Sequence, residues 1–337
     1  MSIRVGIVGI SGYGGGEALR LCAAHPEFHV VYAAGESSAG QTLSQRYPGL
    51  LGSLPHLGES PLGDLVVEKF NPTALPRLDL LFASLPTGQS KAPLAAVPAT
   101  TKIVDIGGDH RYQNGWAYGL ADIWPERIRG QSRIANPGCY PAATLTPLAP
   151  LLAKGLIDPH GIIIDAKSGV SGAGRGGDDA KFAFAECNED VSPYGVLQHT
   201  HVPEISATVR ALAGSSDGLV FTAHLIPMTR GILTTIYCKA APGKGPVETA
   251  ACLDAARDFY AGRSFVKVTD RLLHTKWAYG SNNVFLSYAC DPARNLVMAF
   301  GAIDNLGKGA AGQAVQNANL ICDLPESTGL EGVALWP

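Results

Sequence analysis

The fold class is indicated first by the sequence Ile3-Arg4-Val5-Gly6-Ile7-Val8-Gly9-Ile10-Ser11-Gly12-Tyr13-Gly14-Gly15-Gly16. A run rich in β-branched residues starts at Ile3 and ends at Gly9, which predicts a strand. Residues 17–24 are strong helix formers, and Pro26 lies just beyond them. A strand, a glycine turn and a helix in this order predict the beginning of a βαβ unit.

The glycine turn is a candidate cofactor site. A nucleotide pyrophosphate binds at such a turn against backbone N–H groups and the positive end of the helix dipole, where a Cβ would block its approach. The spacing Gly9-x-x-Gly12-x-x-Gly15 departs from GxGxxG, so the hypothesis depends on the strand–turn–helix context, and an ordinary glycine-rich turn is the alternative. The candidate cofactor-binding residues of the turn are Gly9, Ser11, Gly12, Tyr13, Gly14 and Gly15.

The pattern of strands changes near residue 140. Before it, short apolar runs alternate with helical patterns, which predicts a parallel sheet. Beyond it, strands predominate, which predicts an α+β domain with a mostly antiparallel sheet and helices on one face. An Ala/Gln/Asn-rich helix over 309–321 is expected to return to the first domain. We therefore expect one domain over 1–139 and 309–337 and another over 140–308. The later strands are expected at 161–166, 219–224, 232–239, 284–289 and 296–302.

Composition excludes several classes of protein. The 337 residues carry a net charge of −3, which lacks the basic footprint of a nucleic-acid binder. The seven cysteines are scattered without CxxC spacing, which predicts neither a disulfide framework nor a zinc site and indicates a reducing compartment. The N-terminus lacks the apolar region of a signal peptide, and no apolar run reaches the length of a membrane helix. We expect a cytoplasmic enzyme with a small-molecule substrate and no bound metal.

Cys139 is the candidate nucleophile. It lies in Asn136-Pro137-Gly138-Cys139-Tyr140-Pro141, after a predicted strand and a tight turn and at the start of a predicted helix. A cysteine at a helix N-terminus is stabilised as the reactive thiolate. The alternative is a buried structural cysteine.

The segment His199-Thr200-His201-Val202-Pro203-Glu204-Ile205 holds the candidate acid/base. Histidines two apart on an extended segment point to opposite sides, so at most one of His199 and His201 is expected to face Cys139. Glu204 is a candidate to orient that imidazole. A zinc site or two core histidines are the alternatives.

Candidate anion sites come from three places. The loop Lys167–Gly177, with Ser168 and Ser171, is rich in Gly, Ser and cations and is expected to present N–H groups to an anionic substrate. A mobile surface loop or a subunit contact is the alternative there. Arg111 and Arg230 are further candidates, against the alternative of solvated surface charges.

The loop after the second strand bears on cofactor choice. Residues 35–41 hold no Arg or Lys to bind the 2′-phosphate of NADP, and Glu36 suits the 2′-hydroxyl of NAD. Ser37 and Ser38 are nevertheless able to bond a phosphate. The residues leave NADP and NAD both open.

Taken together, these motifs resemble those of the type 1 N-acetyl-γ-glutamyl-phosphate reductases, a family of the aspartate-semialdehyde dehydrogenase superfamily. The resemblance covers nearly the whole chain and implies a Rossmann-type domain joined to a catalytic and dimerisation domain. The runs that carry it are Gly12-Tyr13-Gly14-Gly15 with Glu17, Asn136 to Pro141, Lys167 to Arg175, His199 to Ile205, His224 to Gly231 and Asp304 to Ala314.

The resemblance implies a reaction and assigns roles. NADPH would reduce N-acetylglutamyl 5-phosphate to the 5-semialdehyde through a thioester on Cys139, with release of phosphate, in arginine biosynthesis. His199 is the favoured acid/base, supported by His201 and Glu204. The resemblance also places Arg111 at the phosphate, Asn136 beside the nucleophile and Asn305 at the cofactor, and it implies a homodimer or homotetramer.

Three other functions remain open at this stage. They are the lysine-pathway homologue that reduces a carrier-bound aminoadipyl phosphate, aspartate-semialdehyde dehydrogenase, and a nucleotide-binding regulator without chemistry. The run from Asn136 to Pro141 favours the arginine branch over the first two, and Cys139 at a helix start disfavours the third.

Overall fold

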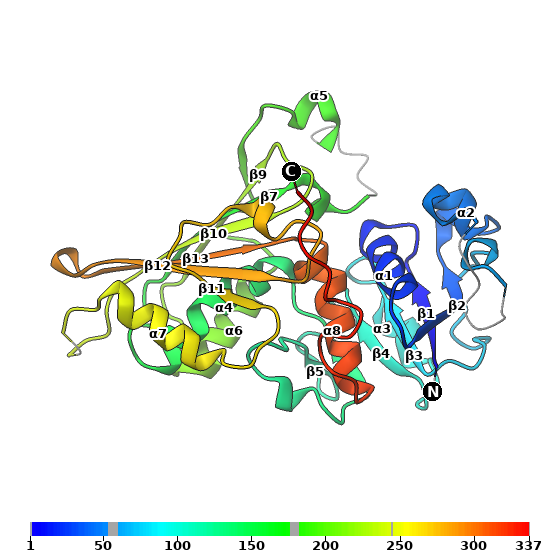
Figure 1. Cartoon of the computed structure of the whole chain (residues 1–337), viewed down its shortest axis with the longest axis horizontal. Helices are drawn as coiled ribbons and strands as arrows, with labels where there is room; N and C mark the ends of the chain where they lie inside the picture. The colour runs from blue at the N-terminus through cyan, green and yellow to red at the C-terminus, as the bar shows by residue number, and fades with distance from the viewer. Residues whose placement is uncertain (1, 53–59, 176–181, 244, 337) are drawn as a thin grey trace. The chain divides into compact units, whose positions relative to one another are not determined.

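The computed structural model describes residues 2–52, 60–175, 182–243 and 245–336 (Figure 1). These residues divide into two compact units. The first takes those within Met1–Pro137, Gly174–Gly176 and Ala310–Glu331, and the second those within Gly138–Ala173, Gly177–Gly309 and Gly332–Pro337.

The first unit is built on a parallel sheet, as the sequence predicted. Its strands are β1 (Ile3–Val8), β2 (Phe28–Ala34), β3 (Leu80–Ala83), β4 (Lys102–Asp105), β5 (Ala117–Tyr118) and β6 (Arg133–Ala135). They follow the order β2-β1-β3-β4-β6-β5, and every pair is parallel. The middle strands are apolar and buried, as in Ile7, Phe82 and Val104, which is typical of a parallel sheet covered on both faces.

Helices of the first unit are α1 (Tyr13–Ala23), α2 (Leu43–Arg46), α3 (Lys91–Ala95) and α8 (Gly312–Ile321). The expected start of α1 at residue 17 was wrong, because the three glycines at 14–16 are already helical. Their low helix propensity is overridden by the close packing of α1 on the end of β1 described below. Helix α8 follows a π-helical turn at Gly307–Ala311 and packs against α1.

The second unit contains the larger sheet. Its strands are β7 (Ile163–Gly169), β8 (Ser192–Tyr194), β9 (Val220–Ile226), β10 (Ile232–Cys238), β11 (Val266–Val268), β12 (Val284–Asp291) and β13 (Leu296–Ile303). The order is β11-β12-β13-β10-β7-β9-β8. Only the β11–β12 and β7–β9 pairs are parallel, so the prediction of a mostly antiparallel sheet is confirmed.

Three helices cover one side of this sheet: α4 (Cys139–Ala153), α6 (Val202–Ala213) and α7 (Thr249–Phe259) (Figure 1). A fourth, α5 (Phe184–Cys187), is a single turn. Helix α4 lies between α6 and α7 and against β10 and β13, and it is buried over its whole length from Tyr140 to Leu152. A helix that is apolar on all sides belongs in such a core.

Two prolines inside α4 leave backbone carbonyls that form hydrogen bonds with other elements of the unit. Pro147 has no N–H for the carbonyl of Ala143 four residues earlier, and the hydroxyl of Thr234 on β10 donates to that carbonyl at 3.1 Å. Pro150 likewise has no N–H for the carbonyl of Thr146, and the Tyr260 hydroxyl donates to that carbonyl at 2.7 Å. Side chains therefore replace the two hydrogen bonds that the prolines remove.

No helix in the described part of the chain is long and apolar enough to cross a membrane.

Candidate functional site

The glycine turn of the first unit is shaped by backbone contacts. Gly9 has φ +85°, and a Cβ on it would lie 2.0 Å from the carbonyl oxygen of Ser84. A Cβ on Gly15 would lie 2.2 Å from the carbonyl oxygen of Gly9, so only glycine lets α1 pack this closely on the end of β1. Gly12 caps α1 with no side-chain hydrogen bond. The first N–H groups of α1 thus have no side-chain acceptor on Gly12, which suits them to an anion.

A pair of hydroxyls lies beside this turn. Ser11 Oγ and Ser38 Oγ are 2.6 Å apart, and Ser38 is buried while Ser37 is exposed. Arg46 of α2 donates from Nη2 to the backbone oxygen of Ser11 at 2.8 Å. Arg46 lies outside residues 35–41, where a cation was expected, and it was not predicted. The spacing gives no signal for it, because the chain between β2 and α2 has to fold back first.

Arg175 reaches the same oxygen. Its Nη1 donates to Ser11 O at 3.4 Å, and Arg175 belongs to the first unit. The loop predicted to serve the substrate therefore contributes to the turn predicted to bind the cofactor. Its last two residues, 176 and 177, lie outside the described residues.

Arg111 and Asn136 also lie in the first unit and contact each other. Arg111 Nε donates to the backbone oxygen of Asn136 at 2.9 Å. The Asn136 side chain is fully buried, where Nδ2 donates to Ala310 O and Oδ1 accepts from Asn317 Nδ2. These bonds hold Asn136 in place at the end of the first unit, one residue before Pro137.

Cys139 is the first residue of α4, as expected. Its side chain is half-buried in the second unit. A Cβ on Gly309 would lie 2.8 Å from Cys139 Cβ, so the glycine-rich tail motif closes directly on the cysteine. Gly309 lies in the π-helical turn, a feature that is frequent at functional sites.

His201 lies against the turn that precedes Cys139. A Cβ on Gly138 would lie 2.4 Å from His201 Nε2, so the imidazole covers Gly138 at van der Waals range. The expectation that His199 and His201 point to opposite sides was wrong. The segment is a turn rather than extended chain, and the two ring centroids are 5.0 Å apart.

His199 lies behind His201. Its Nδ1 accepts the backbone N–H of His201 at 3.1 Å, and its ring contacts Tyr140 at 5.3 Å and Phe221 at 5.0 Å between centroids. Burial lowers the pKa of His199 below its usual value. His199 is therefore neutral at pH 7 and carries its proton on Nε2.

Two tyrosines beside Cys139 were not predicted. The hydroxyls of Tyr140 and Tyr194 are 2.8 Å apart, and Tyr140 also bonds Ser168. Burial raises the pKa of Tyr140 far above its usual range and that of Tyr194 to about 12, and a charged Cys139 adds to both rises. Both phenols therefore keep their protons as hydrogen-bond donors near the thiol. Tyr140 follows Cys139 in sequence, but only the fold brings in Tyr194 from β8.

Glu204 contacts the backbone of the cysteine turn. Its buried Oε1 accepts the N–H of Gly138 at 2.9 Å, while Glu204 itself lies in the first turn of α6. The carboxylate links the histidine segment to the residue before Cys139.

The remaining second-unit candidates form one hydrogen-bonded group. Asn305 is buried, with Oδ1 accepting Gly231 N at 2.7 Å and Nδ2 donating to Ser171 Oγ at 2.9 Å. Arg230 Nε lies 2.9 Å from Oδ2 of the buried Asp304. Asp304 also accepts three backbone N–H groups, so it holds Arg230 in one position. The contacts of Asp304 were not predicted.

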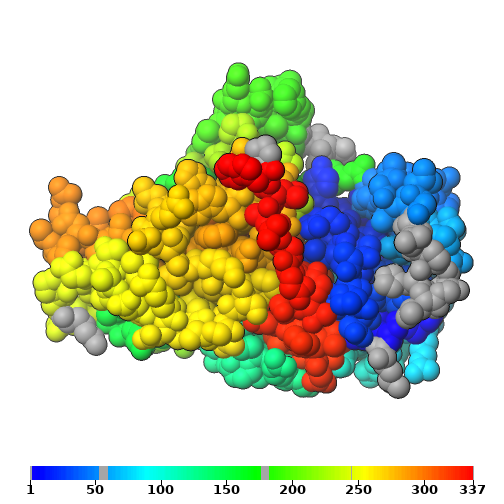
Figure 2. All heavy atoms as spheres, viewed as in Figure 1, coloured from blue at the N-terminus to red at the C-terminus, as the bar shows by residue number. Residues whose placement is uncertain are grey.

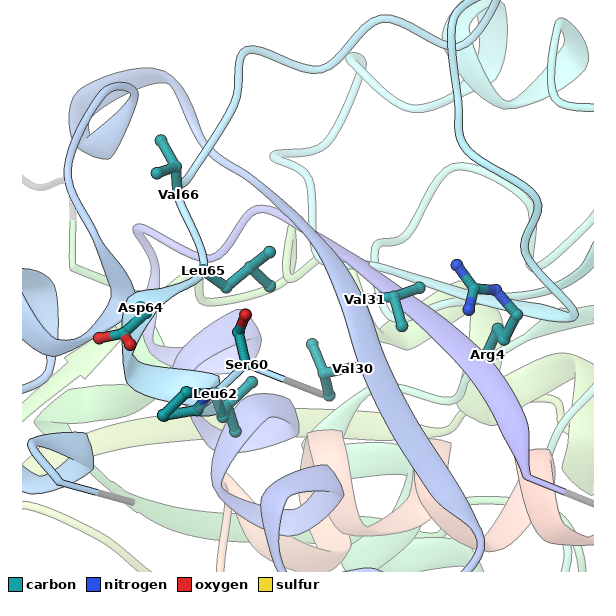
Figure 3. Close-up of a pocket in the computed structure, with 9 residues that line it drawn as sticks. Arg4, Val30, Val31, Ser60, Leu62, Asp64, Leu65 and Val66 are labelled. Atoms are coloured by element: carbon teal, nitrogen blue, oxygen red, sulfur yellow. The ribbon is translucent and has the colours of Figure 1, made fainter. Parts of the chain in front are cut away.

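A cavity of about 610 Å³ in the first unit contains none of the candidate residues. Figure 3 shows Leu65 and Val30 on one side of β2, and Val31 on the other side of that strand, toward Arg4 of β1. Over the ranges that the structure describes, no group of three or more His, Cys, Asp or Glu is arranged to hold a metal ion.

Comparison with known proteins identifies both units. Residues 4–131 match the family model described as the semialdehyde dehydrogenase NAD-binding domain, and residues 139–305 match the one described as the semialdehyde dehydrogenase dimerisation domain. The chain thus has a nicotinamide-dinucleotide domain and the family's dimerisation domain.

Whole-length relatives define the branch. The chain is 64% identical over 338 residues, covering 100% of both chains, to N-acetyl-gamma-glutamyl-phosphate reductases of Methylobacterium sp. (strain 4-46) and Bradyrhizobium sp. (strain ORS 278). Aspartate semialdehyde dehydrogenase of Candida albicans with NADP has the same fold, with a TM-score of 0.72 at 16% identity over 95% of this chain and 98% of that one. The chain belongs to the N-acetyl-γ-glutamyl-phosphate reductase family of the semialdehyde dehydrogenases.

Proposed function

We propose that the chain catalyses the reduction of N-acetyl-L-glutamyl 5-phosphate to N-acetyl-L-glutamate 5-semialdehyde with NADPH, as a step of arginine biosynthesis. The observation that carries the proposal is Cys139 at the first position of α4, between the imidazole of His201 over Gly138 and the backbone of Gly309. A thiol in that position, in a member of this family, suits acyl transfer to sulfur.

Cys139 begins the reaction as the nucleophile. Its sulfur attacks the acyl carbon, and the bond between that carbon and the phosphate oxygen breaks. Phosphate leaves, and the acyl group remains on Cys139 as a thioester. The first N–H groups of α4, which have no side-chain cap, would stabilise the oxyanion, and the Tyr140–Tyr194 pair would add hydroxyl donors near the sulfur. After hydride addition, the thiohemiacetal collapses to the aldehyde and the free thiol.

His201 is our candidate for the proton transfers. Its ring covers Gly138, whereas His199 is held by its Nδ1 to the backbone of His201. His201 would take the proton of the thiol in the first step and return it as the thiohemiacetal collapses. The roles left for His199 and Glu204 are to position His201 and the cysteine turn, with His199 as the alternative acid/base.

NADPH fits the glycine turn of the first unit. The turn lacks a Cβ at Gly9, Gly12 and Gly15, and α1 begins without a side-chain cap. When bound there, the reduced nicotinamide supplies the hydride. Ser11, Ser37 and Ser38 would hold the 2′-phosphate, with Arg46 as the cation that the loop after β2 lacks. Tyr13 and Gly14 complete the turn, and Asn305 would act through the loop of Ser171.

Arg230 is our candidate for the substrate carboxylate, because Asp304 holds its guanidinium in one orientation. Arg111 would bind the phosphate with Asn136 beside it, and Ser168 and Ser171 would bond the acyl chain. The domain roles follow: residues 1–139 and 309–337, apart from Cys139 itself, bind the cofactor, and residues 140–308 hold the other catalytic groups around Cys139. A biosynthetic NADPH reductase of this kind belongs in the cytoplasm.

We further propose a homodimer or homotetramer formed through the sheet face opposite α4. That face carries half-buried apolar side chains from three strands: Leu233, Tyr237, Phe285, Met298 and Phe300. Large apolar side chains on one sheet face favour burial against a second copy.

The test is phosphate-dependent oxidation of N-acetylglutamate 5-semialdehyde, followed as formation of reduced nicotinamide. We expect activity that requires phosphate and a preference for NADP over NAD. Aspartate semialdehyde and a carrier-bound aminoadipate semialdehyde serve as competing substrates. A higher kcat/KM with either would replace the proposed substrate, and no turnover with any of the three would favour a non-catalytic regulator.

Replacing Arg46 tests the cofactor proposal separately. Arg46→Ala is expected to lower kcat/KM for NADP about 10-fold or more and to leave that for NAD within about 2-fold, because only NADP carries the 2′-phosphate. Arg20→Ala on α1, where a half-exposed arginine pairs with Glu17, is the matched control. Equal losses with both cofactors would show that Arg46 only supports the fold of the turn.

A further inference from the structure

Three cysteines of the second unit lie where α7 packs on the sheet. Cys238 of β10 and Cys290 of β12 lie on either side of β13, and both pair with Val297. Cys252 lies on α7, which packs against β12. Neither the sequence motifs nor the proposed reaction uses any of these thiols.

Cys252 and Cys290 are in direct contact. Their sulfurs are 3.7 Å apart, and both cysteines are free. A disulfide requires about 2.05 Å, so a side-chain movement of under about 2 Å would join them. Cys252 is fully buried, whereas Cys290 is partly exposed. An oxidant therefore reaches Cys290 first, and Cys252 lies in contact with Cys290 on its buried side.

The surroundings favour a thiolate on Cys290. The hydrogen bond from Cys252 lowers the pKa of Cys290, and Thr249 adds a smaller effect in the same direction, against the effects of burial and Glu248. Thr249 is the first residue of α7, and its hydroxyl accepts the backbone N–H of Cys290 at 2.9 Å. Cys290 thus lies at the positive end of an 11-residue helix.

We propose that Cys252 and Cys290 form a redox-active dithiol pair that a peroxide converts to an intramolecular disulfide and that a small dithiol reduces again. The inference does not depend on the proposed reductase activity. Helix α7 shows its outer face on the surface of the second unit (Figure 2), while Cys252 lies on its buried side and Cys290 is partly exposed.

The oxidation proceeds in two steps. The Cys290 thiolate attacks one peroxide oxygen, the O–O bond breaks, and Cys290 becomes a sulfenic acid while the departing hydroxide takes a proton to form water. The sulfur of Cys252 then attacks the sulfur of Cys290, the S–O bond breaks, and the second hydroxide leaves as water with the Cys252 proton. Two thiols and one hydrogen peroxide give one disulfide and two water molecules.

The disulfide would clamp α7 to β12. It joins residues 38 apart in sequence, so it restricts the unfolded chain over that loop. We expect the Tm of the oxidised protein to rise by roughly 5 °C and to return on reduction.

The experiment uses the full chain with Cys139→Ser, which removes the proposed nucleophile from the seven cysteines. After brief hydrogen peroxide treatment, we expect the thiols titrated in denaturant to fall from six to four. The mass should fall by two hydrogens, a peptide linking 252 to 290 should appear, and dithiothreitol should restore all three readouts.

Three further variants on this background make the result specific. Cys238→Ser should still lose two thiols, whereas Cys252→Ser and Cys290→Ser should form no such link. A link through Cys238, a thiol count that stays at six, or oxygen added to Cys290 without a link in the Cys139→Ser protein would each overturn the proposal.

Discussion

The two candidate sites are built in opposite ways. The glycine turn of the first unit depends on side chains that are absent, since a Cβ at Gly9 or Gly15 would meet backbone oxygen at about 2 Å. The cysteine site of the second unit depends on side chains from α4, β8 and α6 that converge on one thiol. A site made of backbone is encoded within one short stretch, whereas a site made of side chains is spread along the chain.

This difference predicts how each site fails. A single substitution in the cysteine site should remove chemistry and leave the fold, because we propose that its groups act on the reacting atoms. A methyl added at Gly9 or Gly15 should damage the fold and the cofactor affinity together, because backbone oxygen already occupies that space. The four predictions below test this contrast.

The largest effect is expected at Cys139. Cys139→Ser should lower kcat about 10³-fold or more, because a serine hydroxyl is far weaker as a nucleophile at pH 7 than a thiolate. The Tm should stay within about 2 °C of wild type, since the side chain is only half-buried. Oxidation rates of N-acetylglutamate 5-semialdehyde and a thermal melt measure the two. Equal rates in the variant and wild type would end the thioester mechanism.

Next in size is the comparison of the two histidines. His201→Asn should lower kcat by about 10²-fold or more and remove one limb of the pH–rate profile, because the acid/base is lost. His199→Asn should cost about 10-fold at most and keep both limbs. The reverse order of these two losses would make His199 the acid/base.

The glycine turn provides a graded pair. Gly15→Ala should destabilise the protein by about 3 kcal/mol and raise the KM for NADP, because its Cβ meets Gly9 O at 2.2 Å. Gly12→Ala should cost about 1 kcal/mol or less, since its Cβ finds no atom within 3.4 Å. Urea unfolding gives the free energies. Similar losses from the two variants would show that the backbone contact is not limiting.

The smallest effect concerns pH and stability. Burial lowers the pKa of His199 in the second unit and of His25 in the first. Each unfolded histidine binds a proton near pH 6.5 that the folded form resists, so stability is full above that pH and falls as the pH drops through it. His199→Gln should therefore lose less free energy of unfolding between pH 7.5 and 5.5 than wild type. A slope unchanged by this substitution would contradict the neutral assignment of His199.

Sequence patterns predicted the fold well because the strands of both sheets are encoded by residues close together in the chain. Apolar runs, glycine turns and the start of α4 at Cys139 each depend on near neighbours in the chain. The start of α1 was misplaced because a tertiary contact, Gly15 against Gly9, overrides the poor helix propensity of glycine.

The candidate sites were less predictable for the same reason. His199 and His201 were treated as extended chain, but a turn before α6 brings both rings together. Arg46, Tyr194 and Asp304 carry no local signal, because each reaches its partner only after a distant segment has packed. Residues that act through long-range contacts are invisible to spacing rules.

The prolines of α4 have a mechanical consequence. Sliding the helix forward by one residue would move each carbonyl about 1.5 Å along the axis and about 100° around it. Thr234 and Tyr260 would then meet carbonyls that already accept N–H groups within the helix, and the carbonyls of Ala143 and Thr146 would lose their donors. Helix α4 is therefore held against movement along its own axis during turnover. The Cys139 thiol at the N-terminus of α4 stays in place, and the substrate and cofactor must move to it.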